Sequence, residues 1–386
     1  MTAVAPGDGR PVLFPFGDGA LLFSPDRREL RWLNATAAVI WCLREDGHDA
    51  DGIAAVLRAD AGLQPERARG FVAAALAEWS RADAAPRGGG PVPDATPPMP
   101  VAWPRGGPAV RRVYAIGPVT VEVAFGSLGL AAVLMPVLSH LETTAADAHA
   151  RLAIVETPDG IAIHRDGVRR ALCGPADELA PLALAEAWTA ALGGGHFLFN
   201  IHAGVVANGT GCVLLPAAAG SGKTTLTAAL VHAGLDFFSD EVAPLADPAF
   251  EVTPFPLPFC VKEAGLSPVA AFFPEARRLP FHQRGDGRRV RYLPPPPDRL
   301  PPPDARRPVR AIVFPSYAPD DPRGRLRRLD PTEALPLFLA QCVGVAAELD
   351  TARVARMLHW FNGVPRFELG FANLAWAVDA VLDVMA

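Results

Sequence analysis

Hydrophobic and polar residues alternate at the start of the chain and then recur at helical spacing. Residues 12–34 hold two alternating runs around a turn at residues 24–26, which predicts a β-hairpin. Apolar positions then follow the helical period in three successive stretches. The expected helices are 34–47, 49–61 and 65–80, the last with Phe71, Leu76 and Trp79 on its inner face. A hairpin followed by three helices predicts a small winged-helix-like module over residues 12–84.

Beyond residue 108 the pattern predicts strands that alternate with helices. Short β-like runs and one helical stretch fill residues 110–163. The later strands are expected at 211–216, 235–238 and 309–315, and the later helices at 180–192, 225–233, 332–339, 345–358 and 374–384. This alternation predicts an α/β domain over residues 109–386. Its expected parts are an N-terminal β/α subdomain (109–195), a central core (196–262) and a C-terminal part of strands and helices (263–386).

Composition adds a linker and argues against two kinds of partner. Proline makes up 41 of the 386 residues and is concentrated in 86–108 and 294–303, so we expect a linker at 85–108. A net charge of −5 gives no general attraction to nucleic acid or to anionic lipid. The apolar stretch 128–138 is shorter than the roughly 20 residues that cross a bilayer. We therefore expect neither nucleic acid nor membrane as a partner.

The start of the sequence and its cysteines suggest a compartment. Residues 1–15 show no basic region followed by an apolar one, so no secretory signal is visible. The five cysteines lie far apart and form no CxxC or metal-like pair. A reduced, cytoplasmic protein is the expectation.

A phosphate loop (P-loop) follows the expected strand at 211–216, and a helix starts directly after it. Its residues are Gly220, Ser221, Gly222, Lys223 and Thr224. Glycines let backbone N–H groups close around a phosphate, and the helix N-terminus attracts negative charge. The lysine reaches the β- and γ-phosphate oxygens, and the threonine hydroxyl binds Mg²⁺. We predict that these residues, with Thr225, bind ATP and Mg²⁺, although Ala217 stands where such loops usually begin with glycine.

An acidic pair ends the next expected strand. Asp240 and Glu241 follow the strand at 235–238, so this strand comes directly after the helix of the phosphate loop. Carboxylates at the carboxyl end of a strand beside such a loop are placed to bind Mg²⁺ or to accept a proton. A solvated strand end is the alternative.

Three motifs together resemble the HPr kinase/phosphorylase family, whose fold is called HPr kinase/PEPCK-like. His202 lies on the expected strand that precedes the loop strand, the glycine loop follows, and Asp240 and Glu241 end the next strand. The resemblance covers residues 196–262. It implies an α/β P-loop kinase domain and transfer of a phosphoryl group from ATP to a serine hydroxyl.

The same resemblance implies a role for each matching residue. Asp240 would be the general base, and Glu241, Thr224 and Asp240 would bind Mg²⁺. Lys223 would contact the phosphates and His202 would lie near the transferred phosphoryl group, or else be a packed core histidine. Lys262 is similar to a lysine that faces the phosphates in small HPr kinase-like proteins, although a plain surface lysine is equally compatible.

The sequence departs from the parent family after the acidic pair. No glycine- and arginine-rich stretch of the kind that contacts HPr is found, so we expect neither HPr as the substrate nor phosphorolysis. Ala203 replaces a glycine that usually follows the family's histidine. Arg288, Arg289 and Arg291 form a basic cluster that either clamps the acceptor or is simply solvated.

The N-terminal module resembles the PqqD family, the element that recognises precursors in ribosomal peptide modification. The matching segments are residues 33–41 and the helix at 53–57. The resemblance implies that the leader of a precursor peptide adds as a strand beside the hairpin. A packing domain without a ligand is the alternative.

Together these parts predict a kinase that phosphorylates a serine, or a threonine, of a ribosomally made precursor peptide held by residues 12–84. Similar kinases modify lasso peptides, and that substrate class is the first expectation. A nucleotide-gated peptide-binding protein and a small-molecule kinase with a non-binding N-terminal module are the alternatives. The oligomeric state stays open, a homo-oligomer included.

Overall fold

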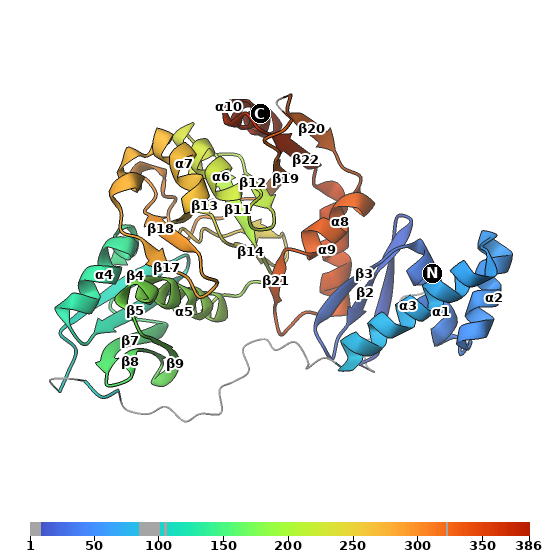
Figure 1. The fold of residues 1–386 in the computed structure, drawn as a ribbon, viewed down its shortest axis with the longest axis horizontal. Coiled ribbons are helices and arrows are strands. Elements are labelled where there is room, and N and C mark those ends of the chain that lie inside the picture. The colour runs from blue at the N-terminus through green and yellow to red at the C-terminus, as the bar shows by residue number, and fades with distance from the viewer. Residues whose placement is uncertain (1–8, 85–100, 104–105, 322) are drawn as a thin grey trace. The chain divides into compact units, whose positions relative to one another are not determined.

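The computed structural model describes residues 9–84, 101–103, 106–321 and 323–386 (Figure 1). The contacts divide the chain into two compact units. Unit 1 comprises the described residues of Met1–Val92, Asp330–Ala340 and Ala347–Gly363, and unit 2 those of Pro93–Leu329, Gln341–Ala346 and Val364–Ala386. Most of the expected linker at 85–108 lies outside the described residues. The division differs from the expected one because two late segments of the chain belong with the N-terminal module.

Unit 1 contains a three-stranded antiparallel sheet of order β1-β2-β3 and five helices. The elements are β1 (Val12–Phe16), β2 (Gly19–Ser24), β3 (Glu29–Leu33), α1 (Ala35–Glu45), α2 (Ala50–Ala61), α3 (Pro65–Ala84), α8 (Pro331–Leu339) and α9 (Thr351–Gly363). The expected hairpin thus has a further strand, and Gly17, with a φ of 59°, makes the tight turn that returns β1 onto β2.

Side chains cap the first two helices as their sequences suggest. Asn34 Oδ1 accepts the Ala37 N–H at 2.9 Å, and Asp49 Oδ1 accepts the Gly52 N–H at 2.7 Å. Gly62 ends α2 in the left-handed conformation. These local signals explain why the bounds of α1 and α2 could be anticipated closely.

Helices α1–α3 pack on the sheet through a core that includes Leu22, Leu33, Ile40, Ile53, Leu57, Val72 and Trp79. Phe71, expected to point inward, is 38% exposed and lies under the Arg67 guanidinium, while its neighbour Val72 is buried. Helices α8 and α9 pack against β3 and β1 respectively, and the Phe361 ring lies 6.4 Å from the Phe16 ring. The sheet of unit 1 therefore packs against helices from two parts of the chain that are distant in sequence.

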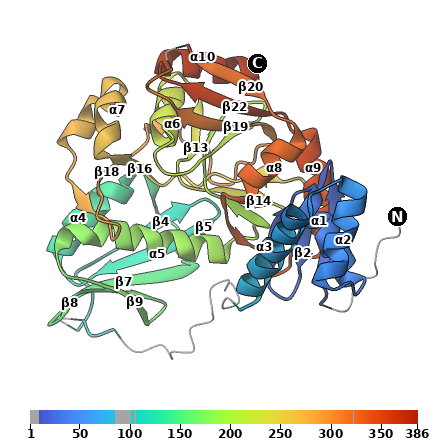
Figure 2. The ribbon, with the colours of Figure 1, turned by 45° about the vertical axis from the view of Figure 1, so that its right-hand side comes forward.

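Unit 2 begins with a six-stranded sheet of order β6-β4-β5-β7-β8-β9. Its elements are β4 (Val110–Ile116), β5 (Val119–Phe125), α4 (Leu128–Leu138), β6 (Glu142–Thr143), β7 (Ala150–Thr157), β8 (Gly160–Arg165), β9 (Val168–Cys173) and α5 (Leu179–Gly194). Figure 2 shows α5 lying along this sheet, and the apolar stretch at 128–138 is α4, which packs into the same core. Among the described helices, none has the length and apolar character needed to cross a membrane.

A second six-stranded sheet of unit 2 has the order β13-β11-β12-β19-β22-β20. Its strands are β11 (Ala203–Ala207), β12 (Cys212–Pro216), β13 (Asp236–Ser239), β19 (Val309–Tyr317), β20 (Arg325–Arg328) and β22 (Arg366–Phe371). Strands β12, β19 and β22 are parallel, and β11 runs antiparallel to both of its neighbours, β12 and β13. Helices α6 (Lys223–His232), α7 (Leu266–Phe272) and α10 (Leu374–Met385) pack into the core of this sheet.

Two smaller sheets complete unit 2, with the orders β15-β14-β10-β21 and β16-β18-β17. Their strands are β10 (Phe199–Ile201), β14 (Ala243–Ala246), β15 (Glu251–Val252), β16 (Phe259–Lys262), β17 (His282–Gln283), β18 (Arg289–Leu293) and β21 (Cys342–Val345). Short 3₁₀ helices are η1 (Ser139–Leu141), η2 (Ala176–Glu178), η3 (Glu263–Gly265), η4 (Pro274–Arg278) and η5 (Pro297–Arg299). The helix expected from residue 345 starts only at Thr351, and Val345 instead ends β21, which pairs with β10.

Candidate active site

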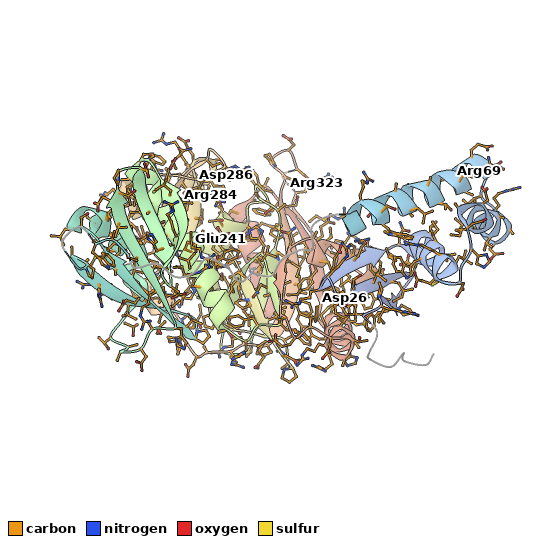
Figure 3. All side chains as sticks on the ribbon, turned by 90° about the horizontal axis from the view of Figure 1, so that it is seen from below. Asp26, Arg69, Glu241, Arg284, Asp286 and Arg323 are labelled. Atoms are coloured by element: carbon orange, nitrogen blue, oxygen red, sulfur yellow. The ribbon has the colours of Figure 1, made fainter. Side chains whose placement is uncertain are left out.

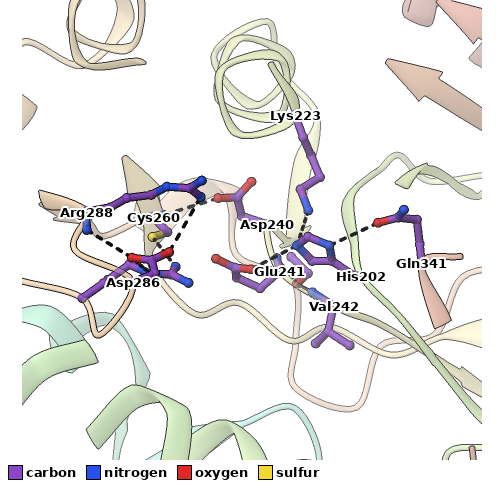
Figure 4. Close-up of polar contacts among 11 residues, drawn as sticks. His202, Lys223, Asp240, Glu241, Val242, Cys260, Asp286, Arg288 and Gln341 are labelled. Atoms are coloured by element: carbon purple, nitrogen blue, oxygen red, sulfur yellow. Dashed lines mark hydrogen bonds and ion pairs between the residues drawn. The ribbon is translucent and has the colours of Figure 1, made fainter. Parts of the chain in front are cut away.

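Strand directions bring three separate motifs to one edge of the second sheet. Because β11 is antiparallel to β12 and β13, its N-terminal end shares an edge with the carboxyl ends of the other two. The glycine loop follows β12, Asp240 and Glu241 follow β13, and His202 immediately precedes β11. Figure 4 shows His202, Lys223, Asp240 and Glu241 converging there.

The loop between β12 and α6 uses its glycines where the backbone requires them. Gly220 and Gly222 have φ values of 94° and 84°, which side chains other than glycine adopt only with strain. Ala217 has no positive φ and is buried, so alanine is tolerated in place of the usual first glycine. Lys223 is the first residue of α6, and the free N–H groups of the first helical turn follow the loop.

Lys223, His202 and Gln341 form a chain of polar contacts. Lys223 Nζ lies 2.6 Å from His202 Nε2, and His202 Nδ1 lies 3.3 Å from Gln341 Oε1. The main-chain N–H of His202 also donates to the main-chain carbonyl oxygen of Gln341 at 2.7 Å. Gln341 directly precedes β21, which pairs with β10, so the sheet pairing places Gln341 beside His202.

The chemistry of these groups restricts their protons. An ammonium group has only donors, so when Lys223 is charged His202 Nε2 must accept, and the ring proton lies on Nδ1. Nδ1–H then donates to Gln341 Oε1. Lys223 is only 7% exposed, and burial lowers the pKa of its ammonium although the charges of Asp240 and Glu241 oppose this. His202 therefore holds the lysine at the mouth of the loop.

Asp240 is the most deeply buried acid of the site. It is 2% exposed, and its Oδ2 accepts the Cys260 N–H at 3.3 Å. Burial, and next the negative charge of Glu241, raise the pKa of Asp240 to about 7, although Lys223 and the nearby Thr224 hydroxyl pull it down. A carboxyl group with such a pKa can accept a proton near neutral pH.

Glu241 is the more accessible acid, with 36% of its side chain exposed. Its Oε2 lies 3.5 Å from His202 Nε2. Burial alone would raise the pKa of Glu241, but a polar contact with His202, in the state in which Nε2 carries the ring proton, and the charges of Lys223 and Arg284 outweigh it and hold the pKa below its usual range. The two neighbouring acids thus have opposite pKa shifts, which separates a group that can accept a proton near neutral pH from a carboxylate that is ionised there.

The remaining expected residues lie at or next to this edge. Lys262 ends β16, and its charge lowers the pKa of Lys223, so the two lysines lie within electrostatic reach. Thr225 lies in the first turn of α6 and faces Gly265, where an added Cβ would lie 3.4 Å from its Oγ1.

Arg288, Arg289 and Arg291 do not act as one cluster. Arg289 and Arg291 lie 4.0 and 3.8 Å from the centre of the Phe281 ring, and Arg291 also donates to main-chain oxygens of Arg277 and Leu279. Arg288 is paired with Asp286 at 3.7 Å. These contacts fit a structural role for Arg289 and Arg291. The side chain of Arg288 is solvated.

Two residues of the site were not anticipated from the sequence. One is Gln341. The other is Arg284, whose Nη1 lies 3.6 Å from Cys260 Sγ and whose positive charge lowers the pKa of Glu241. Figure 3 shows Arg284 and Asp286 on the same side of unit 2 as Glu241. Gln341 and Arg284 reach the site only through contacts with segments that are distant in sequence. The local sequence pattern around either residue therefore gives no sign of its position.

A nucleoside triphosphate with Mg²⁺ fits the groups at this edge. In the part of the chain that the structure describes, Ser221 Oγ and Asp240 Oδ1 are buried without a hydrogen-bond partner. A hydroxyl can donate to phosphate and a carboxylate oxygen can bind a cation. The described residues hold no group of three or more His, Cys, Asp and Glu side chains that could bind a metal alone. Glu241 and Thr224, beside Asp240, would therefore hold Mg²⁺ only together with phosphate oxygens, as is usual for this ion.

Sequence comparison found no protein-family model that matches the chain and no curated protein that matches it.

Proposed function

We propose that the chain is an ATP-dependent kinase that phosphorylates a serine, or a threonine, of a ribosomally synthesised precursor peptide. The observation that carries this proposal is the pairing of a glycine loop and its Lys223 with Asp240, a buried acid whose pKa is raised to about 7. A general base works best when its pKa lies near the working pH.

Each residue then has a distinct task. The loop N–H groups and Lys223 hold the phosphates, and Mg²⁺ neutralises phosphate charge when it is bound. Asp240 accepts the proton of the acceptor hydroxyl while Glu241, kept ionised by its surroundings, and Thr224 bind the metal. Arg284 adds a positive charge beside Glu241. His202 holds Lys223 in place and is positioned by Gln341.

Unit 1 supports a peptide as the acceptor. In the described chain, β1 and β3 are the outer strands of its sheet and each pairs with a strand on one side only. An extended peptide can add as a strand to such an edge. Binding one part of a precursor in this way raises the effective concentration of its acceptor residue at the site.

The test is incubation of the protein with Mg-ATP and candidate precursor peptides, with mass spectrometry for an added phosphate. Asp240→Asn should abolish phosphate transfer and leave nucleotide binding in place. Gain of phosphate by none of the peptides would contradict the kinase proposal. Nucleotide-dependent peptide binding that persists without transfer, in wild type and variant alike, would favour a nucleotide-gated binding protein instead.

A further inference from the structure

Tyr317 is hydrogen-bonded to the glycine loop through its backbone and is half exposed to solvent. It ends β19, and its N–H donates to the Ser221 carbonyl oxygen at 2.9 Å. A Cβ added to Gly222 would come within 3.2 Å of Tyr317 Cβ. Tyr317 is nevertheless 50% exposed. The loop therefore fixes the backbone of this residue while one part of a large aromatic surface stays uncovered.

A buried neighbour supports the exposed ring. Tyr317 pairs in register with Phe371 of β22, whose ring lies 5.8 Å away at 64°, in an edge-to-face arrangement. Phe371 is 2% exposed and also approaches Gly222, since an added Cβ would lie 3.0 Å from its Cζ. Edge-to-face packing restrains a ring and keeps part of its surface available. The Tyr317 ring is thus a supported aromatic surface beside the loop.

The order of the strands gives the two sides of the loop different roles. In β13-β11-β12-β19, the strand that ends at the acidic pair lies on one side of the loop strand β12, and β19 with Tyr317 lies on the other. With Asp240 as the base of the proposed reaction, a triphosphate on the loop points its γ-phosphate toward Asp240, and its nucleoside end then lies on the side of β19.

We propose that Tyr317 stacks on the base of the bound nucleoside triphosphate. This inference rests on the proposed function, because it requires that the loop bind a triphosphate. Every base has a π-face, so stacking on an aromatic side chain binds different bases with little discrimination. The site should therefore accept ATP and GTP with affinities within about tenfold of each other.

The experiment is isothermal titration calorimetry of the full chain with ATP, GTP and inorganic tripolyphosphate, each with Mg²⁺. Tyr317→Ala should weaken binding of both nucleotides by about tenfold and leave tripolyphosphate binding unchanged. Tyr317→Phe and Tyr317→Trp should bind nucleotides as the wild type does. Phe71→Ala is the matched control, because Phe71 is an exposed aromatic of unit 1 that is 38% accessible.

The outcomes separate the two proposals. If Tyr317→Ala binds ATP like the wild type, the base platform is wrong and the phosphate loop stands. If Tyr317→Ala weakens the binding of tripolyphosphate as much as that of ATP, Tyr317 only supports the loop and the inference is overturned. The same holds if Tyr317→Phe loses as much nucleotide affinity as Tyr317→Ala. If the wild type binds neither ATP nor tripolyphosphate, the proposed function fails and the inference fails with it.

Discussion

Lys223 Nζ and His202 Nε2 lie 2.6 Å apart, and His202 is held from its other side by Gln341. The hydrogen bond between His202 and Gln341 makes Gln341 a positioning residue. Gln341 holds the ring proton of His202 on Nδ1, and Nε2 then faces Lys223. Gln341→Leu should remove this preference, which ¹⁵N spectra of the histidine rings would detect as a shift between the two ring tautomers. Phosphate transfer should fall by about tenfold, the equivalent of one hydrogen bond between neutral groups, about 1.4 kcal/mol.

Gln341→Glu is the matched variant, because a carboxylate also accepts the Nδ1 proton. It should keep the Nδ1–H form of His202. An unchanged ring spectrum in Gln341→Leu would show that Gln341 does not set the tautomer, whatever the variant does to the rate.

Gly204 allows α6 to approach β11. A Cβ at this position would lie 2.3 Å from Thr227 Oγ1 and 3.4 Å from Lys223 Cγ. Gly204→Ala should therefore push the start of α6 away, lower the free energy of unfolding by about 1–3 kcal/mol and weaken nucleotide binding. Gly209→Ala is the control, since nothing lies within 4 Å of an added Cβ there. Equal stability of the two variants in urea unfolding would contradict this packing account.

Asp240 should make the metal-free protein less stable as the pH rises. The carboxyl ionises near pH 4 in the unfolded chain, whereas its folded pKa is raised to about 7. Between these values the folded state binds more protons, so the free energy of unfolding falls by about 1.4 kcal/mol for each pH unit. Below about pH 4 both states are protonated and the effect disappears.

Asp240→Asn removes this titration. Urea unfolding in EDTA from pH 4 to 8 should show the variant gaining stability relative to the wild type as the pH rises. Glu241, whose folded pKa is lowered, titrates at the acidic end and is present in both proteins. A constant difference between them across this range would show that Asp240 ionises normally in the folded protein.

Arg284 should contribute to transfer through its charge. Arg284→Ala removes one of the positive charges that lower the pKa of Glu241, so the rate of phosphate transfer should fall by about tenfold. Arg284→Lys should recover part of the rate. Arg323→Ala is the control, because the Arg323 side chain is 88% exposed and its ion pair is with Asp321. A loss of the same size in both variants would indicate a general effect of surface charge.

The sequence allowed prediction of those features that depend on neighbouring residues. Cap residues and the turn at Gly62 define α2, and the strand–loop–helix order defines the environment of Lys223. The helical period located α3 but assigned Phe71 to the inner face, where Val72 lies instead. A shift of one position is enough to reverse burial on a helix, because successive side chains are about 100° apart.

Long-range pairing could not be anticipated. Gln341 lies 139 residues after His202 and reaches it only because β21 pairs with β10. The sequence pattern pointed to the basic residues around Arg288 as a candidate cluster. The arginine whose charge acts on Glu241 is instead Arg284, which contacts Cys260. Which arginine faces the acids depends on the pairing of β16, β17 and β18, and no local pattern encodes it.

Unit 1 is built from three separate stretches of chain, and this limits how the protein can be engineered. Phe361 of α9 is fully buried and lies near Phe16 of β1, so removal of the first 84 residues would uncover part of the apolar surface of α8 and α9. Loss of activity in a protein without these residues could then result from aggregation as well as from loss of peptide binding. Transfer of unit 1 to another protein would require residues 330–340 and 347–363 along with the N-terminal segment.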